Sequence, residues 1–194
     1  MSLNKIKEEI RILGWDDGPF EKGFGKAPLV GVVFRGGSFM DGMLKTEVVV
    51  DGEDAEEKIV DAVMRCKFKD IRVMMFDGIT FAGFNTVNIK NVHAKTGLPV
   101  IVVLRKKPNF ESFLTAIGRM PNAEKRKECV AAAGSVNWTD TGKGRLAFQC
   151  AGINAEDAAK IIGISCLHAN MPEPLRIAHL IGTAIVKGQS IGGA

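Results

Sequence analysis

The chain has 194 residues, of which 46% are hydrophobic and 25% charged, and its formal net charge is +4. Such a chain can bury the core of one soluble domain, so we expect a single domain over 1–194 with a loose tail over 188–194. No segment is long and apolar enough to cross a membrane. The mild positive charge permits a nucleic-acid partner without requiring one, and nothing in the composition sets the oligomeric state.

The cysteines exclude a zinc centre and a disulfide framework. Cys66, Cys129, Cys150 and Cys166 form no Cys-x-x-Cys pair, and their spacing suits neither kind of site. With no secretory signal in the sequence, we expect reduced thiols and a cytoplasmic protein.

The first third of the chain predicts an antiparallel meander of three strands. Residues 10–16 form the first strand, and the glycine-rich stretch 17–27 predicts a loop. Strands over 29–34 and 43–50 flank Arg35-Gly36-Gly37-Ser38, which is typical of a two-glycine hairpin turn.

The next part predicts parallel α/β units. A helix over 54–67 has Asp54 as its predicted N-cap. The apolar runs 71–76 and 98–104 are typical of strands covered on both faces, and 85–96 predicts a short helix between them. Alternating strands and helices indicate parallel pairing with right-handed crossovers.

The last part predicts four helices and one hairpin. They are helices over 109–118, 122–133, 154–168 and 172–187, and a hairpin of strands over 136–141 and 145–150. A meander followed by α/β units, with helices on both faces of a mixed sheet, is the ribonuclease H-like arrangement. We therefore expect that α/β fold by analogy of element order.

Three predicted strands end in carboxylates. Asp16 and Asp17 close the first strand, Asp51 closes the third, with Asp54 nearby, and Asp77 closes the most apolar one. Side chains at the carboxyl edge of an α/β sheet can converge on a ligand, and Mg²⁺ prefers such oxygen donors. An aspartate at a strand end is also a common turn former or helix cap, and for Asp54 we favour capping.

Basic residues and one histidine are candidate partners of this edge. Arg105 and Lys106 follow a predicted strand and can grip a phosphate backbone, although a solvated loop fits equally well. Arg176 and His179 lie three apart and share a face of the last helix. His179 either holds a water or phosphate near the metals or is hydrogen-bonded beneath its helix.

Two further stretches favour structural roles. Phe81 and Phe84 can stack on a base, but packing is the simpler interpretation, with Asn85 capping the following helix. The run Lys125-Arg126-Lys127 is flanked by glutamates, which indicates a solvated helix face.

Several segments together resemble an uncharacterised, largely archaeal protein family. They are ILGWDDGPF, VVVDGEDA, FDGITFAGFN, TGLPVIVVLRKKP and MPEPLRIAHLIG, and they span nearly the whole chain. That family is a distant relative of endonuclease V, a ribonuclease H-like nuclease. Endonuclease V uses Mg²⁺ to cut strands near deaminated purines, notably inosine.

The resemblance to endonuclease V implies a partial set of site residues. Its first-strand metal aspartate matches Asp16 in Gly14-Trp15-Asp16, and its Asp-Gly after the fourth strand matches Asp77. Its lysine falls near Arg105 or Lys106, and its C-terminal helix start resembles the stretch 172–178. An aspartate follows there in endonuclease V, where this chain has His179.

Two departures from endonuclease V concern recognition and metal binding. Asp51 stands near the position of a glutamate in that enzyme, and Asp54 competes with it for the role. The Pro-Tyr wedge of endonuclease V has no counterpart here, because the chain contains no tyrosine. The departures leave inosine recognition open.

The leading hypothesis is a nuclease that uses Mg²⁺ or Mn²⁺ to hydrolyse phosphodiester bonds in DNA or RNA. One alternative is a nucleic-acid-binding module that kept the fold without the chemistry, and another is metal-dependent chemistry on a small phosphorylated metabolite. The residues assigned by the leading hypothesis are Asp16, Asp51 and Asp77 as metal ligands, His179 as a further catalytic group, Asp17 and Asp54 as helpers, and Arg105, Lys106 and Arg176 at the phosphate.

Overall fold

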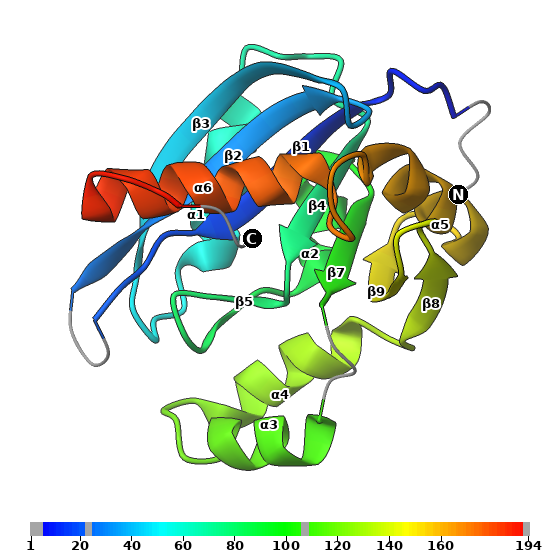
Figure 1. The fold of residues 1–194 in the computed structure, drawn as a ribbon. Helices are drawn as coiled ribbons and strands as arrows, with labels where there is room; N and C mark the ends of the chain where they lie inside the picture. Colours follow the sequence, from blue (N-terminus) through cyan, green and yellow to red (C-terminus); the bar gives the residue numbers. More distant parts are fainter. Residues whose placement is uncertain (1–5, 22–24, 106–108, 192–194) are drawn as a thin grey trace.

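The computed structural model describes residues 6–21, 25–105 and 109–191. Over these residues, seven strands form one mixed sheet in the order β3-β2-β1-β4-β7-β9-β8, and two short strands pair separately (Figure 1). The strands are β1 (Arg11–Asp17), β2 (Lys26–Arg35), β3 (Phe39–Val49), β4 (Val73–Asp77), β5 (Thr80–Phe81), β6 (Asn85–Thr86), β7 (Val100–Leu104), β8 (Asn137–Asp140) and β9 (Arg145–Ala151).

Helices cover both faces of the sheet, as predicted. One core cluster joins β1 and β4 to α1 and α2, and a second joins the opposite face to α5 and α6. The helices are α1 (Ala55–Arg65), α2 (Ile89–Thr96), α3 (Phe110–Ile117), α4 (Ala123–Ala132), α5 (Ala155–Ser165) and α6 (Glu173–Lys187).

The pairing of the strands follows the predicted pattern. β1, β2 and β3 form an antiparallel meander, while β1–β4 and β4–β7 pair in parallel. β4 and β7 are buried on both faces, as the apolar runs in the sequence indicated. β2 and β3 are longer than predicted, since Lys26 and Phe39 already belong to the ladder across the hairpin.

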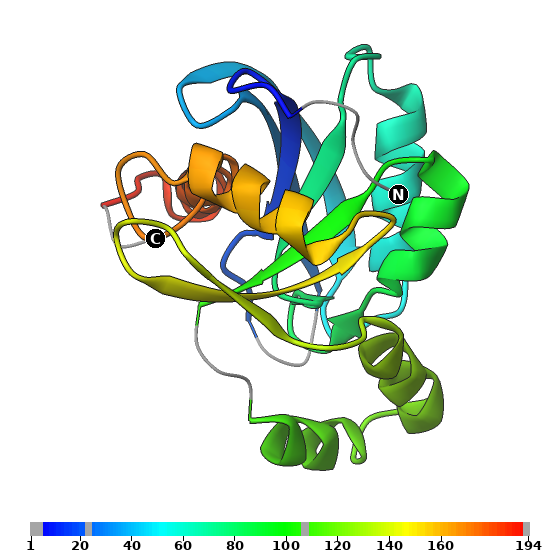
Figure 2. The same cartoon turned by 90° about the vertical axis from the view of Figure 1, so that its right-hand side faces the viewer.

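The helical hairpin α3–α4 lies beyond the carboxyl end of β7, away from the sheet (Figures 1 and 2). Its two ends are fixed by local signals, since the Asn109 side chain accepts from the Ser112 amide and Gly134 adopts a positive φ after α4. α6, in contrast, runs across β1 and β2 on the face opposite α1 (Figure 1).

At the N-terminus of α1, the structure differs from two of the predicted helix caps. Asp54 occupies the N-cap position, but its side chain makes no capping bond and accepts instead from the Val49 amide. The Ala55 amide is satisfied by Asn85, a buried residue of β6, at 3.0 Å. Asn85 therefore serves α1, and the cap of α2 is Asn88.

Arg126 corrects the prediction of a solvated face on α4. Its side chain is only 2% exposed, whereas its neighbours Lys125 and Lys127 pair with glutamates at the surface. The alternating charges around it resemble an exposed helix because the buried partners of Arg126 lie far away in the sequence.

Two close contacts fix α6 against β1. A Cβ on Gly14 would lie 2.6 Å from the Cβ of Pro174, and one on Gly18 would lie 2.7 Å from the carbonyl oxygen of Gly182. Ala178, between these helix positions, packs against β2. The spacing of four between the three helix residues puts them on one face, so small groups let the helix approach the strand.

The structure describes the C-terminal end of the chain only as far as residue 191. Residues 188–191 follow α6, with Ile191 86% exposed, and 192–194 lie outside the described residues, as does Lys106. In the part of the chain that the structure describes, no helix combines the length and apolarity needed to traverse a bilayer.

Replacing Gly14 with alanine tests the contact between α6 and β1. Because the new methyl would overlap Pro174, we expect the free energy of unfolding to fall by about 1–3 kcal/mol. Chemical denaturation measures the change. The matched control is Gly163→Ala on the exposed face of α5, where the added Cβ would meet no neighbouring group within 4 Å. Helix propensity predicts that this change raises the free energy of unfolding by up to ~1 kcal/mol. Equal stability of Gly14→Ala and the native chain would show that α6 is not fixed by this contact.

Candidate active site at the carboxyl ends of β1 and β4

Three adjacent strand ends bring charged side chains to one edge of the sheet. Trp15 of β1 pairs with Phe76 of β4, so Asp16 and Asp77 are the next residue on each strand. Arg105 follows the end of β7, the next strand along. These groups face an open hollow of about 330 Å³, lined by Asp16, Asp17, Gly18, Pro19, Phe20, Asp77, Arg105 and His179.

Asp16 is held by α6. Its carboxylate is buried, with the residue 5% exposed, and its Oδ2 lies 2.9 Å from Nδ1 of His179. Burial raises the pKa of Asp16 to about 6, and the negative charge of Asp77 adds to the rise, although the hydrogen bond from His179 opposes it. The same hydrogen bond raises the pKa of His179. For Asp16, burial therefore shifts the pKa more than the hydrogen bond does. Both side chains bind a proton more tightly than they would in water.

Asp77 is held by Arg105. The guanidinium Nη2 lies 2.5 Å from Oδ2 of Asp77, and Nε lies 3.2 Å from the same oxygen. The side chain of Arg105 is 39% exposed, so it can meet an incoming anion from solvent. A guanidinium held in this way presents a fixed fork of donors at the mouth of the hollow.

Asp17 is a third carboxylate of the hollow. Burial raises its pKa to about 7, and the neighbouring charge of Asp16 adds to the rise. A hydrogen bond from the backbone amide of Ala82 opposes it. The sequence indicated Asp17 only as a helper of the metal ligands.

Asp51 and Asp54 lie outside the residues that line this hollow. Oδ1 of Asp51 accepts from the Phe84 amide at 2.9 Å, and its own amide donates to the Ala82 carbonyl. Asp54 bonds to Val49 and to Asn85. Both carboxylates thus join the end of β3 to the turn after β5, which lies beside Asp17.

The predicted phosphate residues are placed differently from one another. Arg105 lines the hollow, and Lys106 is outside the described residues. Arg176 donates twice to Glu173, a carboxylate that is almost fully buried, at 2.9 and 2.6 Å. Arg176 is therefore part of the start of α6 and is not among the lining residues.

The donor set of the hollow fits a hard cation with few protein ligands. Within residues 6–21, 25–105 and 109–191, no group of three or more His, Cys, Asp or Glu side chains is arranged to hold a metal ion. Asp16, Asp17 and Asp77 nevertheless offer oxygen atoms in one hollow, where burial raises the pKa of the first two. Mg²⁺ commonly takes one or two carboxylates and keeps its waters.

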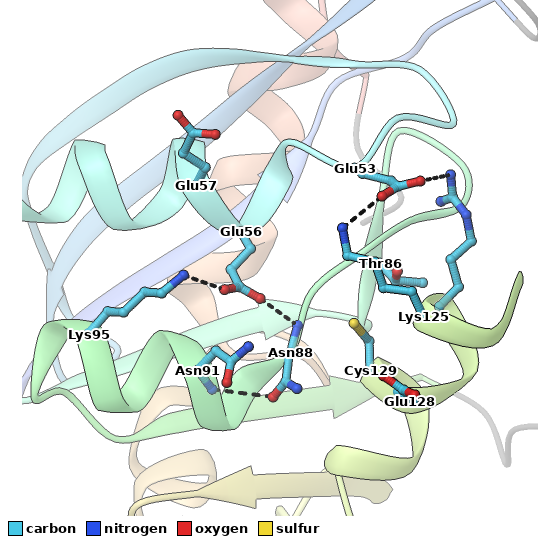
Figure 3. A pocket seen from close by; sticks show the side chains of 11 residues that line it. Glu53, Glu56, Glu57, Thr86, Asn88, Asn91, Lys95, Lys125, Glu128 and Cys129 are labelled. Atoms are coloured by element: carbon cyan, nitrogen blue, oxygen red, sulfur yellow. Dashed lines mark hydrogen bonds and ion pairs between the residues drawn. The ribbon is translucent and has the colours of Figure 1, made fainter. Parts of the chain in front are cut away.

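A second hollow, of about 290 Å³, lies between α1, α2 and α4 (Figure 3). Its charges are paired across it, with Glu53 bound to Lys125 and Glu56 bound to Lys95. Among the described residues, no predicted site residue lines it. The chemistry of this hollow therefore does not match the one at the strand ends.

Replacing Asp17 with asparagine tests the burial of charge in the hollow. Because the folded pKa is raised above the ordinary aspartate value of 3.8, the folded chain binds the proton more tightly than the unfolded chain. Stability contributed by Asp17 is therefore lost as pH rises from about 4 to about 7. We expect Asp17→Asn to raise the free energy of unfolding at pH 8 by ~1–3 kcal/mol in metal-free buffer and to change it little at pH 4.

Asp61→Asn, on the exposed face of α1, is the control for this series. Urea denaturation at pH 4, 6 and 8 measures the free energy of unfolding of the native chain and of both variants. If the free energy of unfolding changes with pH in the same way for Asp17→Asn and for the native chain, the assigned burial of Asp17 is contradicted.

Comparison with protein families identifies relatives over almost the full chain. The family model described as Endonuclease dU matches residues 8–186. A UPF0215 protein of Methanopyrus kandleri is 41% identical over 197 residues and covers 100% of both chains. A UPF0215 protein of Methanosarcina barkeri is 44% identical over 190 residues and covers 97% of each.

Solved structures share the fold. A protein of unknown function from Archaeoglobus fulgidus is similar with a TM-score of 0.82 and 40% identity, covering 90% of this chain and 97% of that chain. Endonuclease V of Ciona intestinalis, in complex with DNA containing an inosine, gives a TM-score of 0.63 at 16% identity, with 96% and 89% covered. Human endonuclease V gives 0.60 at 14% identity, with 92% and 84% covered.

The expected ribonuclease H-like fold and the expected archaeal relatives are both confirmed by these likenesses. The match over residues 8–186 and the full-length relatives show that the chain belongs to the endonuclease dU family.

Proposed function

We propose that this protein is a Mg²⁺-dependent endonuclease that hydrolyses phosphodiester bonds in nucleic acid. The observation that supports this most directly is the hollow itself, where Asp16 and Asp77 end adjacent parallel strands beside His179 and Arg105. The family model and the endonuclease V fold agree with such chemistry.

Each lining residue has a role that its contacts favour. Asp16 and Asp77 would provide oxygen ligands for a divalent cation, with Asp17 beside them, and the cation when bound would neutralise phosphate charge and activate a water. His179 orients Asp16 through Nδ1 and carries a proton beside it. Arg105 leaves Asp77 for the phosphate, because a bidentate guanidinium suits either anion.

Asp51 and Asp54 have supporting roles in this proposal. Oδ1 of each carboxylate accepts from donors around the end of β3 and the turn after β5. We assign them to the turn beside the hollow, and we assign the carboxylates at the ends of β1 and β4 as the ligands of the cation.

The names of the relatives indicate the substrate to test first. The family model is named for deoxyuridine, and the structural neighbour from Ciona intestinalis binds DNA containing an inosine. Both are deaminated nucleosides, so we propose DNA carrying a deaminated base. Phe20 is among the residues that line the hollow, and its ring offers a surface on which a base can stack.

Replacing Asp77 with asparagine tests the proposal. Duplex and single-stranded oligonucleotides with one deoxyuridine, one inosine or neither are incubated with the purified chain and Mg²⁺ or Mn²⁺. We expect cleavage of at least one modified strand, and a loss of at least ~100-fold in rate for Asp77→Asn, because a carboxylate that would hold the cation is removed.

Two variants serve as controls for this assay. Asp61→Asn lies on exposed α1 and should cleave like the native chain, and Asp51→Asn should lose less than ~10-fold, since an amide oxygen can still accept from Phe84. Absence of metal-dependent cleavage on every DNA and RNA substrate would reject the proposal.

A module that binds nucleic acid without cutting it is the second candidate. It is favoured by the ion pair between Arg105 and Asp77, which occupies a carboxylate that the cation needs. Binding that weakens with salt and does not respond to Mg²⁺ or to Asp77→Asn would support this alternative.

A further inference from the structure

We propose that Arg126 of α4 is a positioning residue for the hollow at the strand ends, acting through the turn that carries Ala82. The inference rests on the proposed function for its catalytic consequence, but its structural part stands on contacts alone. It links the helical hairpin α3–α4 to the carboxylates by named hydrogen bonds.

The guanidinium of Arg126 is almost fully buried and binds main-chain carbonyls. Nη2 donates to Asp51 at 2.9 Å, and Nη1 donates to Gly52 at 3.0 Å and also to Phe84. Nε donates to Pro121 at 2.9 Å, within the hairpin. The nearest carboxylate oxygen recorded, on Glu53, lies 3.7 Å away, so carbonyl dipoles hold most of this charge.

The backbone around Arg126 is strained. Within the described ranges, the non-glycine residues with positive φ are Asp51 (55°), Ala82 (45°) and Asn122 (53°). Two of the three are directly bonded to Arg126, because the Asp51 carbonyl accepts from the guanidinium and the Asn122 carbonyl accepts from its amide. Such conformations persist where the surroundings hold them, and they gather at functional sites.

The third strained residue connects Arg126 to the hollow. The Asp51 amide donates to the Ala82 carbonyl at 2.8 Å, and the Asp51 side chain accepts from the Phe84 amide at 2.9 Å. The backbone of Ala82 in turn lies close enough to the carboxyl of Asp17 to lower its pKa. Arg126 therefore fixes one side of the turn whose other side holds Asp17.

This arrangement assigns a function to a charge that packing alone does not require. A buried cation whose nearest recorded carboxylate oxygen lies 3.7 Å away is expensive to desolvate, and an apolar side chain could fill the space on α4. A guanidinium is the side chain whose fork can hold several carbonyls from three chain segments at once. The geometry points to accuracy in the placement of Ala82 and Asp17 as its benefit.

Amide hydrogen exchange tests the structural part directly. Native chain, Arg126→Lys and Arg126→Met are compared at a temperature where all remain folded. We expect the amides of Asp51, Ala82 and Phe84 to exchange at least ~10-fold faster in both variants, because their acceptors are no longer fixed. Amides in the β1–β4 ladder should keep their protection. If Arg126→Met does not fold, Arg126→Lys alone decides.

Val130→Ala is the matched control, since Val130 is buried one turn further along α4 and has no part in the carbonyl contacts. It should destabilise the chain without selective exchange at the three amides. Exchange in the Arg126 variants equal to that in Val130→Ala would overturn the proposal.

Two functional readouts follow the exchange experiment. Mn²⁺ affinity, measured by calorimetry without nucleic acid, should fall at least ~10-fold in the Arg126 variants and stay unchanged in Val130→Ala. With a cleavable oligonucleotide, kcat should fall while KM changes little. If the native chain cleaves nothing, the proposed function fails, whereas the exchange data still decide whether Arg126 positions the turn.

Discussion

The close approach of α6 to β1 is the constraint on which the candidate site depends. Gly14 of β1 and Gly18, directly after the strand, leave no room for a side chain against Pro174 and Gly182 on the helix. The helix therefore lies low enough for His179 to reach Asp16 at 2.9 Å. A larger residue at either contact would separate the imidazole from the carboxylate while leaving the sheet intact.

Burial of like charges is the second property of this region. Asp16 and Asp17, the last two residues of β1, are desolvated, which raises the pKa of both, and the charge of Asp77 adds to each rise. His179 and Arg105 oppose the rise for Asp16 without cancelling it. A region that keeps such charge without full compensation stores free energy that a divalent cation can release, which is how binding and stability become coupled.

Much of the fold could be predicted because its signals are local. Apolar runs, the two-glycine turn and the caps at Asn109 and Asn154 fix strands and helices within a few residues of themselves. The positions of Asp16 and Asp77 also followed from a general rule, since parallel strands bring their carboxyl ends to one edge.

The sequence could not predict the contacts that join distant segments. Asn85 caps a helix that begins 30 residues earlier, and Arg126 binds carbonyls 42 to 75 residues away. Charge patterning around Arg126 matched an exposed helix because its burial is decided by the loops at Asp51 and Phe84. The Phe84 amide that donates to the Asp51 carboxylate is likewise distant in the sequence. The sequence therefore indicated only a strand-end ligand at Asp51 and not its hydrogen bond to this turn.

The separation of 163 residues between Asp16 and His179 has a consequence for the order of assembly. During synthesis from the N-terminus, the carboxylates of β1 and β4 leave the ribosome long before α6 exists. The imidazole joins them only after the residues between β4 and α6 have emerged. A chain that ends before α6 thus carries Asp16 without the imidazole that orients it, which restricts the complete site to molecules that include this helix.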